Sequence, residues 1–140
     1  MNNITASQVM RYKKITGIPT MDGKRYLQNL SSEKLDLIFK AIEIAEQENN
    51  RLLRDPREDN PKFKEVVQIV EKEVEREVNE YHNKRILELE ETSPAVADLF
   101  RTGRGLCHRF WYLKKQKLWE SYGIDWMTPV EMNSHVIFDR

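Results

Sequence analysis

The sequence predicts an all-α fold, and three observations lead to this prediction. The stretch from Pro61 to Glu91 holds no glycine and no further proline. Its apolar residues recur mostly three or four positions apart, which is the spacing of one helix face and not of a strand. In addition, 33% of the residues are charged and 39% are hydrophobic, as expected for amphipathic helices with charged outer faces. We therefore expect a small N-terminal three-helix bundle, a long central helix, C-terminal helices and an extended tail.

The composition limits the class of protein. With 140 residues, the chain is long enough for one domain or two small helical units. Its net charge of zero argues against a strongly electropositive nucleic-acid binder. The single cysteine, Cys107, cannot form an intrachain disulfide, which fits a reducing compartment. No apolar run approaches the roughly 20 residues of a membrane span, and the N-terminus lacks the features of a signal peptide, so we expect a cytoplasmic protein without a membrane segment.

Residues 1–54 are predicted to form the three-helix bundle. The first helix covers about 4–16 and stops at Gly17, the second follows the next turn, and the third runs from about Glu33 to Arg54. The candidate capping residues, in chain order, are Thr5 or Ser7, Thr20, and Ser31 or Ser32. The apolar residues expected to face the core of this bundle are Val9, Met10, Met21, Tyr26, Leu27, Leu35, Ile38, Phe39, Ile42, Ala45 and Leu52.

The N-terminal segment also carries a pattern that consists of Ile4-Thr5-Ala6-Ser7, Val9, Thr16-Gly17, Met21-Asp22, Lys24-Arg25, Leu27 and Ala41-Ile42. Over about residues 3–46, this pattern resembles the opening of bacterial elongation factor Ts. A Thr-Gly helix–turn–helix of similar shape occurs in the C-terminal domain of ribosomal stalk proteins. The resemblance implies a ubiquitin-associated-like three-helix fold that binds a protein, because the family's segment contacts elongation factor Tu. The rest of the chain has no equivalent of the family's nucleotide-exchange core, so exchange activity is not implied.

Asn60 and Pro61 are suited to begin the central helix, as its N-cap and its first residue. The polar run before them marks the clearest boundary, so we expect a bundle over 1–54, a linker over 55–60 and a helical region over 61–140. Because the apolar spacing is not a clean heptad, packing within the chain is favoured over a coiled-coil dimer, and both monomer and homodimer stay open. The apolar face of this helix is predicted to consist of Phe63, Val66, Val67, Val70, Val74, Val78, Tyr81 and Leu89.

Shorter helices are predicted after the central one. In chain order, they are a helix from Ser93 and Pro94 to Thr102, a helix from Gly105 or Leu106 to Tyr122, and one turn from Thr128, whose capping box is completed by Glu131. Residues from Asn133 on are expected to form an extended tail. Large apolar side chains near this end are costly to leave in water, so they either fold back onto the bundle or anchor the chain in a partner. They are Trp126, Met127, Val136, Ile137 and Phe138.

Residues 101–119 are the strongest candidate for a binding segment, because aromatic residues are interspersed there with bases and no acid is present. In one interpretation, the aromatic residues pack in a core while the bases cover the acidic central helix. In two others, this stretch binds a nucleic acid, with phosphates on the bases and nucleobases on the rings, or an acidic protein. Lys114 and Lys117 fall on or near the apolar face of the predicted helix, so each must meet a carboxylate or extend to water. The six bases are Arg101, Arg104, Arg109, Lys114, Lys115 and Lys117.

No catalytic or metal-binding motif is found. Cys107 and His108 are adjacent, which on a helix points them about 100° apart, and no Cys-x-x-Cys or His-x-x-x-His pair exists. The sequence also lacks a Gly-rich phosphate loop and a Ser-His-Asp order. We therefore expect a protein that is not an enzyme and that uses no metal and no cofactor.

The leading functional hypothesis is a small protein-binding adaptor or inhibitor that acts through exposed helix faces, on a translation-factor-like protein or another large cytoplasmic complex. Its candidate partner-binding residues are Lys24, Arg25, Trp126 and Phe138. The alternative is a nucleic-acid-associated protein that uses the six bases of residues 101–119. A third hypothesis is a structural subunit that self-associates along the central helix.

Overall fold

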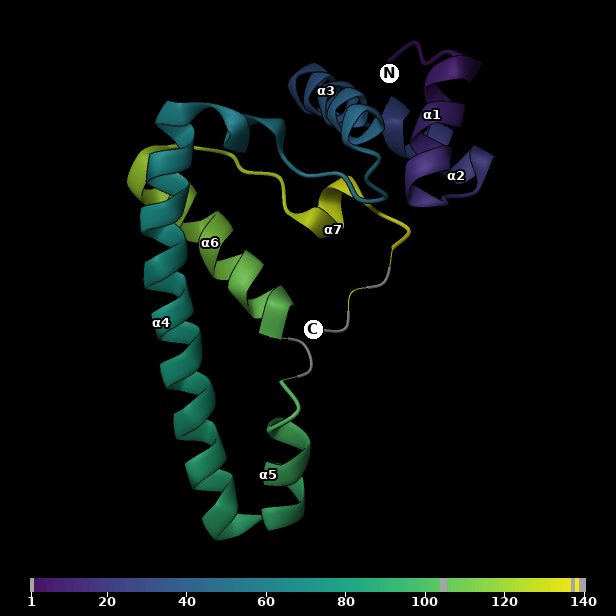
Figure 1. Ribbon diagram of the computed structural model, residues 1–140. Coiled ribbons are helices and arrows are strands. Elements are labelled where there is room, and N and C mark those ends of the chain that lie inside the picture. Colours follow the sequence, from purple (N-terminus) through teal and green to yellow (C-terminus); the bar gives the residue numbers. More distant parts are fainter. Residues whose placement is uncertain (1, 104–105, 137, 139–140) are drawn as a thin grey trace. The chain divides into compact units, whose positions relative to one another are not determined.

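The computed structural model describes residues 2–103, 106–136 and 138. These residues form helices and no strand, so the predicted all-α class is confirmed (Figure 1). In chain order, the helices are α1 (Ala6–Thr16), α2 (Thr20–Gln28), α3 (Ser32–Glu48), the short 3-10 helix η1 (Pro56–Asp59), α4 (Pro61–Thr92), α5 (Pro94–Phe100), α6 (Leu106–Tyr122) and α7 (Pro129–Met132).

The chain divides into two compact units. Unit 1 consists of Met1–Lys64 with Trp126–Ile137, and unit 2 of Glu65–Asp125 with Phe138–Arg140. By its contacts, the segment that contains α7 therefore groups with the N-terminal helices, although it follows unit 2 in the sequence. The predicted division into a bundle over 1–54, a linker over 55–60 and a helical region over 61–140 stays a prediction; in the structure, residues 55–60 contain η1.

The first three helices begin and end at residues with clear local reasons. Thr5 forms a capping box with Gln8 at the start of α1, and Gly17 ends it at a φ of 75°. Ser31 caps α3, which ends at Glu48 and not at Arg54 as predicted, because Asn49 adopts the left-handed conformation. The expected cap of α2 was also wrong: Pro19 precedes the helix, and Thr20 is already its first residue.

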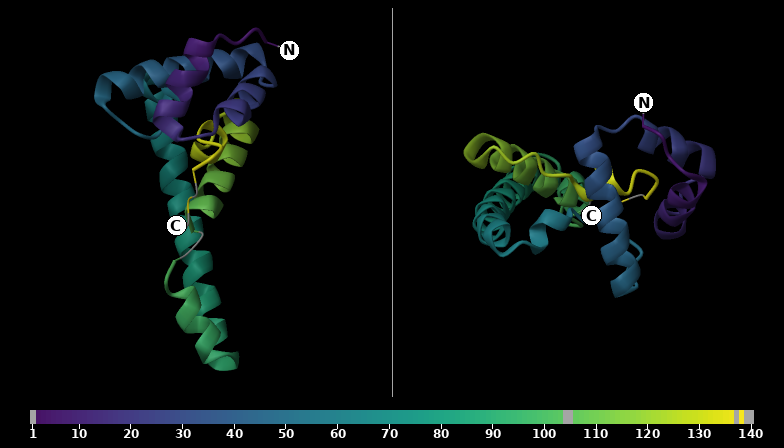
Figure 2. Two further views of the ribbon diagram at one scale, coloured as in Figure 1. Left: turned by 90° about the vertical axis from the view of Figure 1, so that its right-hand side faces the viewer. Right: turned by 90° about the horizontal axis from the view of Figure 1, so that it is seen from above.

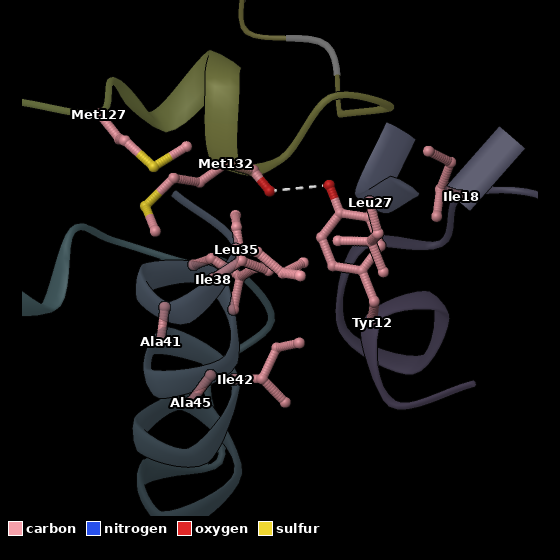
Figure 3. Packing of buried hydrophobic residues seen from close by; sticks show 11 residues of the cluster. Tyr12, Ile18, Leu27, Leu35, Ile38, Ala41, Ile42, Ala45, Met127 and Met132 are labelled. Carbon is pink, nitrogen blue, oxygen red and sulfur yellow. Dashed lines mark hydrogen bonds between the residues drawn. The ribbon is translucent and has the colours of Figure 1, made fainter. Parts of the chain in front are cut away.

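The core of unit 1 is shared by α1, α2, α3 and the C-terminal segment. Figure 3 shows Met127 and Met132 beside the apolar face of α3, and Tyr12 between α3 and α2. Three predicted core residues are instead exposed, namely Met10, Met21 and Leu52, and Leu53 is buried in place of Leu52. The residues of this core are Tyr12, Ile18, Leu27, Leu35, Ile38, Ala41, Ile42, Ala45, Leu53, Met127 and Met132.

Buried hydrogen bonds fix the C-terminal segment in unit 1. Asn133 is fully buried; its amide donates to the Leu53 carbonyl at 2.8 Å and accepts from the Leu53 N–H at 2.8 Å. The buried carboxylate of Asp55 accepts from the Met127 N–H at 3.0 Å, and the Tyr12 hydroxyl donates to the Met132 carbonyl at 2.9 Å (Figure 3). Buried polar groups that are all paired in this way hold one arrangement, because separating them would leave each one unpaired.

In unit 2, the long helix α4 carries α5 and α6 along its side (Figure 2). Asn60 accepts from the Lys62 N–H at 3.0 Å at the start of α4, as predicted for an N-cap. The valines of the predicted apolar face are buried or half-buried, but Tyr81 is exposed. Ser93 precedes α5 but makes no side-chain cap hydrogen bond. Among the described residues, none of the helices combines the length and the apolar composition that a membrane span needs.

Candidate protein-binding surfaces

Two of the bases of α6 are neutralised by α4. Lys114 is only 4% exposed, and its Nζ lies 2.7 Å from Glu71 Oε1. Lys117 Nζ lies 2.9 Å from Glu77 Oε1 and 3.6 Å from Glu73 Oε2. The hydrogen bond to Glu77 raises the pKa of the Lys117 ammonium above its ordinary value. Both lysines thus meet carboxylates, which was one of the two outcomes that the sequence allowed.

The other described bases of residues 101–119 are engaged as well. Lys115 forms an ion pair with Asp125 at 3.4 Å, and Arg101 pairs with Glu90 and Asp98. The guanidinium of Arg109 lies 3.8 Å from the centre of the Tyr81 ring, a cation–π contact. Arg104, a further candidate, lies outside the described residues. The interpretation in which these bases cover the acidic central helix holds for Arg101, Lys114 and Lys117, which meet carboxylates of α4. Its other half, that the aromatic residues pack in a core, does not hold for Tyr112 and Trp119, which are exposed.

Two of the four predicted partner-binding residues are instead used inside the fold. Trp126 is 3% exposed and donates its indole N–H to Glu58 Oε1 at 3.0 Å, so it is a core residue and not a surface anchor. Phe138 is half-buried and packs edge-on against Trp111, with ring centres 5.1 Å apart. Both therefore stabilise their own units, as large apolar side chains near a chain end do when a core can accept them.

Lys24 and Arg25, the other two, lie exposed on α2. Met21 precedes them by three and four positions, so the three side chains share one helix face, which we call the α2 face. Met21 is 68% exposed. Neither base forms an ion pair with a carboxylate of the described residues, in contrast to Lys114 and Lys117. The α2 face is therefore basic, apolar at its first position and open to solvent.

A shallow groove of about 480 Å³ adjoins the α2 face, and we call it the α2 groove. At its side, the Tyr26 hydroxyl donates to the Glu131 carbonyl, and burial raises the pKa of this phenol well above its ordinary value. The groove is bounded by more apolar than polar surface. Its lining residues are Ile18, Asp22, Arg25, Tyr26, Asn29, Leu30 and Ser134.

The position of α2 is fixed by close packing on α1. A Cβ atom at Gly23 would lie 3.0 Å from Ile18 Cγ2, which is tighter than normal contact, so a glycine lets α2 approach the turn after α1. Tyr12 and Tyr26 stack at a centroid distance of 6.1 Å between the same helices. The α2 face and groove are therefore held on a packed scaffold.

A second exposed surface was not predicted from the sequence. Tyr112 and Trp119 on α6 are 66% and 61% exposed, and with Lys115, Gln116 and Asp125 they line a hollow of about 250 Å³. Their spacing of seven places both on one face of α6, about 100° to 120° around the helix from the buried Leu118, which the sequence pattern could have shown. Tyrosine and tryptophan are the residue types most often found at the centre of protein interfaces.

The potential metal-binding and nucleophilic side chains of the described residues have the following surroundings. The described residues contain no group of three His, Cys, Asp or Glu side chains that could hold a metal ion. Cys107 is a half-buried free thiol, and His82 stacks on Phe100 with ring centres 5.2 Å apart. The His108 ring lies close to the Phe138 carbonyl and packs edge-on against the Trp111 ring.

In comparisons with known proteins, no protein-family model, no curated protein and no solved structure matches this chain. The resemblance of residues 3–46 to elongation factor Ts therefore stays a prediction. The functional argument rests on the surfaces described above.

Proposed function

We propose that this chain is a small, non-enzymatic protein-binding adaptor or inhibitor that docks through the α2 face. The single observation that carries the proposal is the exposure of Lys24 and Arg25 beside Met21 and an adjoining groove, with no carboxylate of the described chain paired to either base. An arginine next to an apolar hollow is a common centre of a protein interface. The proposal includes a cytoplasmic location and a ubiquitin-associated-like architecture for α1–α3.

The rigidity of this surface supports the proposal. Gly23 and the stacked tyrosines fix α2 on α1, and the C-terminal segment completes the core below them. A surface that is already ordered loses less conformational entropy when a partner binds.

Nucleic-acid association through residues 101–119 is the weaker candidate. Their described bases contact carboxylates or a ring of the same chain, and phosphate binding would have to break these contacts. For Lys114 the loss would be large, because the ammonium group is buried.

The proposal is tested by placing a photo-crosslinking amino acid at position 21 of the full-length chain, in cells of its native host. We expect a covalent adduct with one dominant protein that survives nuclease treatment and disappears in the Lys24→Glu/Arg25→Glu variant. The matched control is Lys72→Glu/Lys84→Glu, which changes the net charge equally at exposed sites of α4. An absent protein adduct, or an adduct that the charge reversal leaves unchanged, would contradict the proposal.

A further inference from the structure

The charges of unit 1 are unevenly distributed between its helices. The first 31 residues contain five bases and one acid, whereas residues 32–48 contain two bases and five acids. Arg11 is neutralised by Glu46 at 2.5 Å, an ion pair that lowers the pKa of the Glu46 carboxyl. The remaining four bases form no ion pair within the described chain, and they are Lys13, Lys14, Lys24 and Arg25.

Lys13, Lys24 and Arg25 lie near the turn that joins α1 to α2, and we call the surface that they form the α1–α2 corner. Lys13 Nζ donates to the Thr20 hydroxyl at 3.2 Å, and Thr20 precedes Lys24 by one helical turn on the same side of α2. One edge of α2 is thus flanked by two ammonium groups about one turn apart. On its other edge, Arg25 lines the α2 groove together with Ile18.

Bases that pair with no acid of the described chain, beside a groove with apolar lining, favour a protein ligand over a nucleic acid. A duplex nucleic acid presents a continuous row of phosphates and gains little from a groove with apolar lining. Asp22 also lines the groove and would repel phosphates there. A protein segment can avoid this single carboxylate and still place apolar side chains on Tyr26 and Leu30.

We propose that the α1–α2 corner binds an acidic, amphipathic segment of another protein. Its carboxylates pair with Lys13, Lys24 and Arg25, and its apolar side chains cover Met21 and enter the α2 groove. This inference rests on the proposed function and names the chemistry of the partner. The chain itself contains a comparable arrangement in unit 2, where Glu73 and Glu77, one turn apart on α4, hold Lys117 of α6.

The inference is tested with a library of random peptides, each about 16 residues long, displayed on phage and selected on the full-length chain. Peptides that also bind the Lys24→Glu/Arg25→Glu variant are removed. We expect the remaining peptides to be rich in Asp and Glu, with apolar residues three or four positions apart. A synthetic consensus peptide should bind at least about tenfold more weakly to the variant, lose affinity as salt rises, and change less than about twofold on Lys72→Glu/Lys84→Glu.

Three outcomes would overturn the inference: selected peptides that are neutral or basic, affinity that the charge reversal leaves unchanged, or a random-sequence DNA duplex that binds more tightly than the consensus peptide. If crosslinking at position 21 captures a protein while the selection yields no acidic consensus, the partner chemistry alone is wrong. If crosslinking also fails, the proposed function is wrong as well.

Discussion

The bases of α6 and the bases of the α1–α2 corner have opposite surroundings. On α6, Lys114 and Lys117 lie against the carboxylates of α4. On α2, Lys24 and Arg25 lie in solvent without an acidic partner in the described chain. The sequence shows both groups as short basic runs beside apolar residues. The comparison teaches that a basic run predicts a binding surface only where the fold leaves its charges unneutralised.

The largest expected effect is the difference in stability between two charge reversals, one on α6 and one on α2. In Lys114→Glu, a buried carboxylate would face Glu71, and we expect the free energy of unfolding to fall by about 3–5 kcal/mol. Lys24→Glu alters an exposed side chain that forms no ion pair in the described chain, so we expect the free energy of unfolding to change by no more than about 0.5 kcal/mol. Urea unfolding followed by circular dichroism measures both.

Lys114→Met separates charge from packing in this experiment. Methionine keeps the length of the side chain and removes the buried ammonium group, and the Glu71 side chain, which is 40% exposed, can be solvated by water instead. We therefore expect stability close to that of the natural chain. Equal losses in Lys114→Glu and Lys24→Glu would show that the two regions do not differ as the structure describes.

A smaller effect is expected where a neutral polar group is buried and paired. Asn133→Ala would leave the N–H and the carbonyl of Leu53 without their partner, and we expect a loss of about 1–3 kcal/mol. The matched control is Asn50→Ala, because Asn50 is exposed and its side chain donates a hydrogen bond to Glu48, which is exposed as well. A loss in Asn133→Ala no greater than in the control would contradict the role assigned to the C-terminal segment.

Local patterns allowed most of the fold to be predicted. The α4 helix was expected within one residue at its C-terminal end, because Pro61 starts it and no helix breaker follows before Thr92. The capping box of Thr128 was predicted, and Thr5 was one of two candidate caps of α1, because in both cases the partner lies three residues away. Errors arose where a helix ended without glycine or proline, as at Asn49.

The candidate site could be predicted only in part. Lys24 and Arg25 were candidates from the sequence and are exposed, and their binding role stays a prediction. Trp126 was expected either to anchor a partner or to fold back onto the bundle, and it is buried. Its indole N–H donates to Glu58, which lies 68 positions away, and no local pattern reveals such a contact. The same reason explains why the pairing of Lys114 with Glu71 was only one of several open interpretations.

The smallest effect is expected from the two stacked tyrosines that hold α2. Burial raises the pKa of both Tyr12 and Tyr26 above the ordinary value of 10.0, so the folded chain favours the neutral phenols. Their contribution to stability is complete below about pH 10 and is lost as the pH rises toward the higher pKa values of the folded state. We therefore expect the stability advantage of the natural chain over Tyr12→Phe/Tyr26→Phe, about 1 kcal/mol per lost hydrogen bond near neutral pH, to shrink between about pH 9 and about pH 11.

Urea unfolding at a series of pH values measures this difference directly. Lysines such as Lys117, whose pKa is raised by Glu77, also lose charge in alkali, but they do so in both proteins and cancel in the comparison. Tyr122→Phe is the control, because it removes the phenol of an exposed tyrosine. An advantage over the double variant that stays constant above about pH 10 would mean that the two phenols ionise equally well in the folded and unfolded chains, which would contradict their burial.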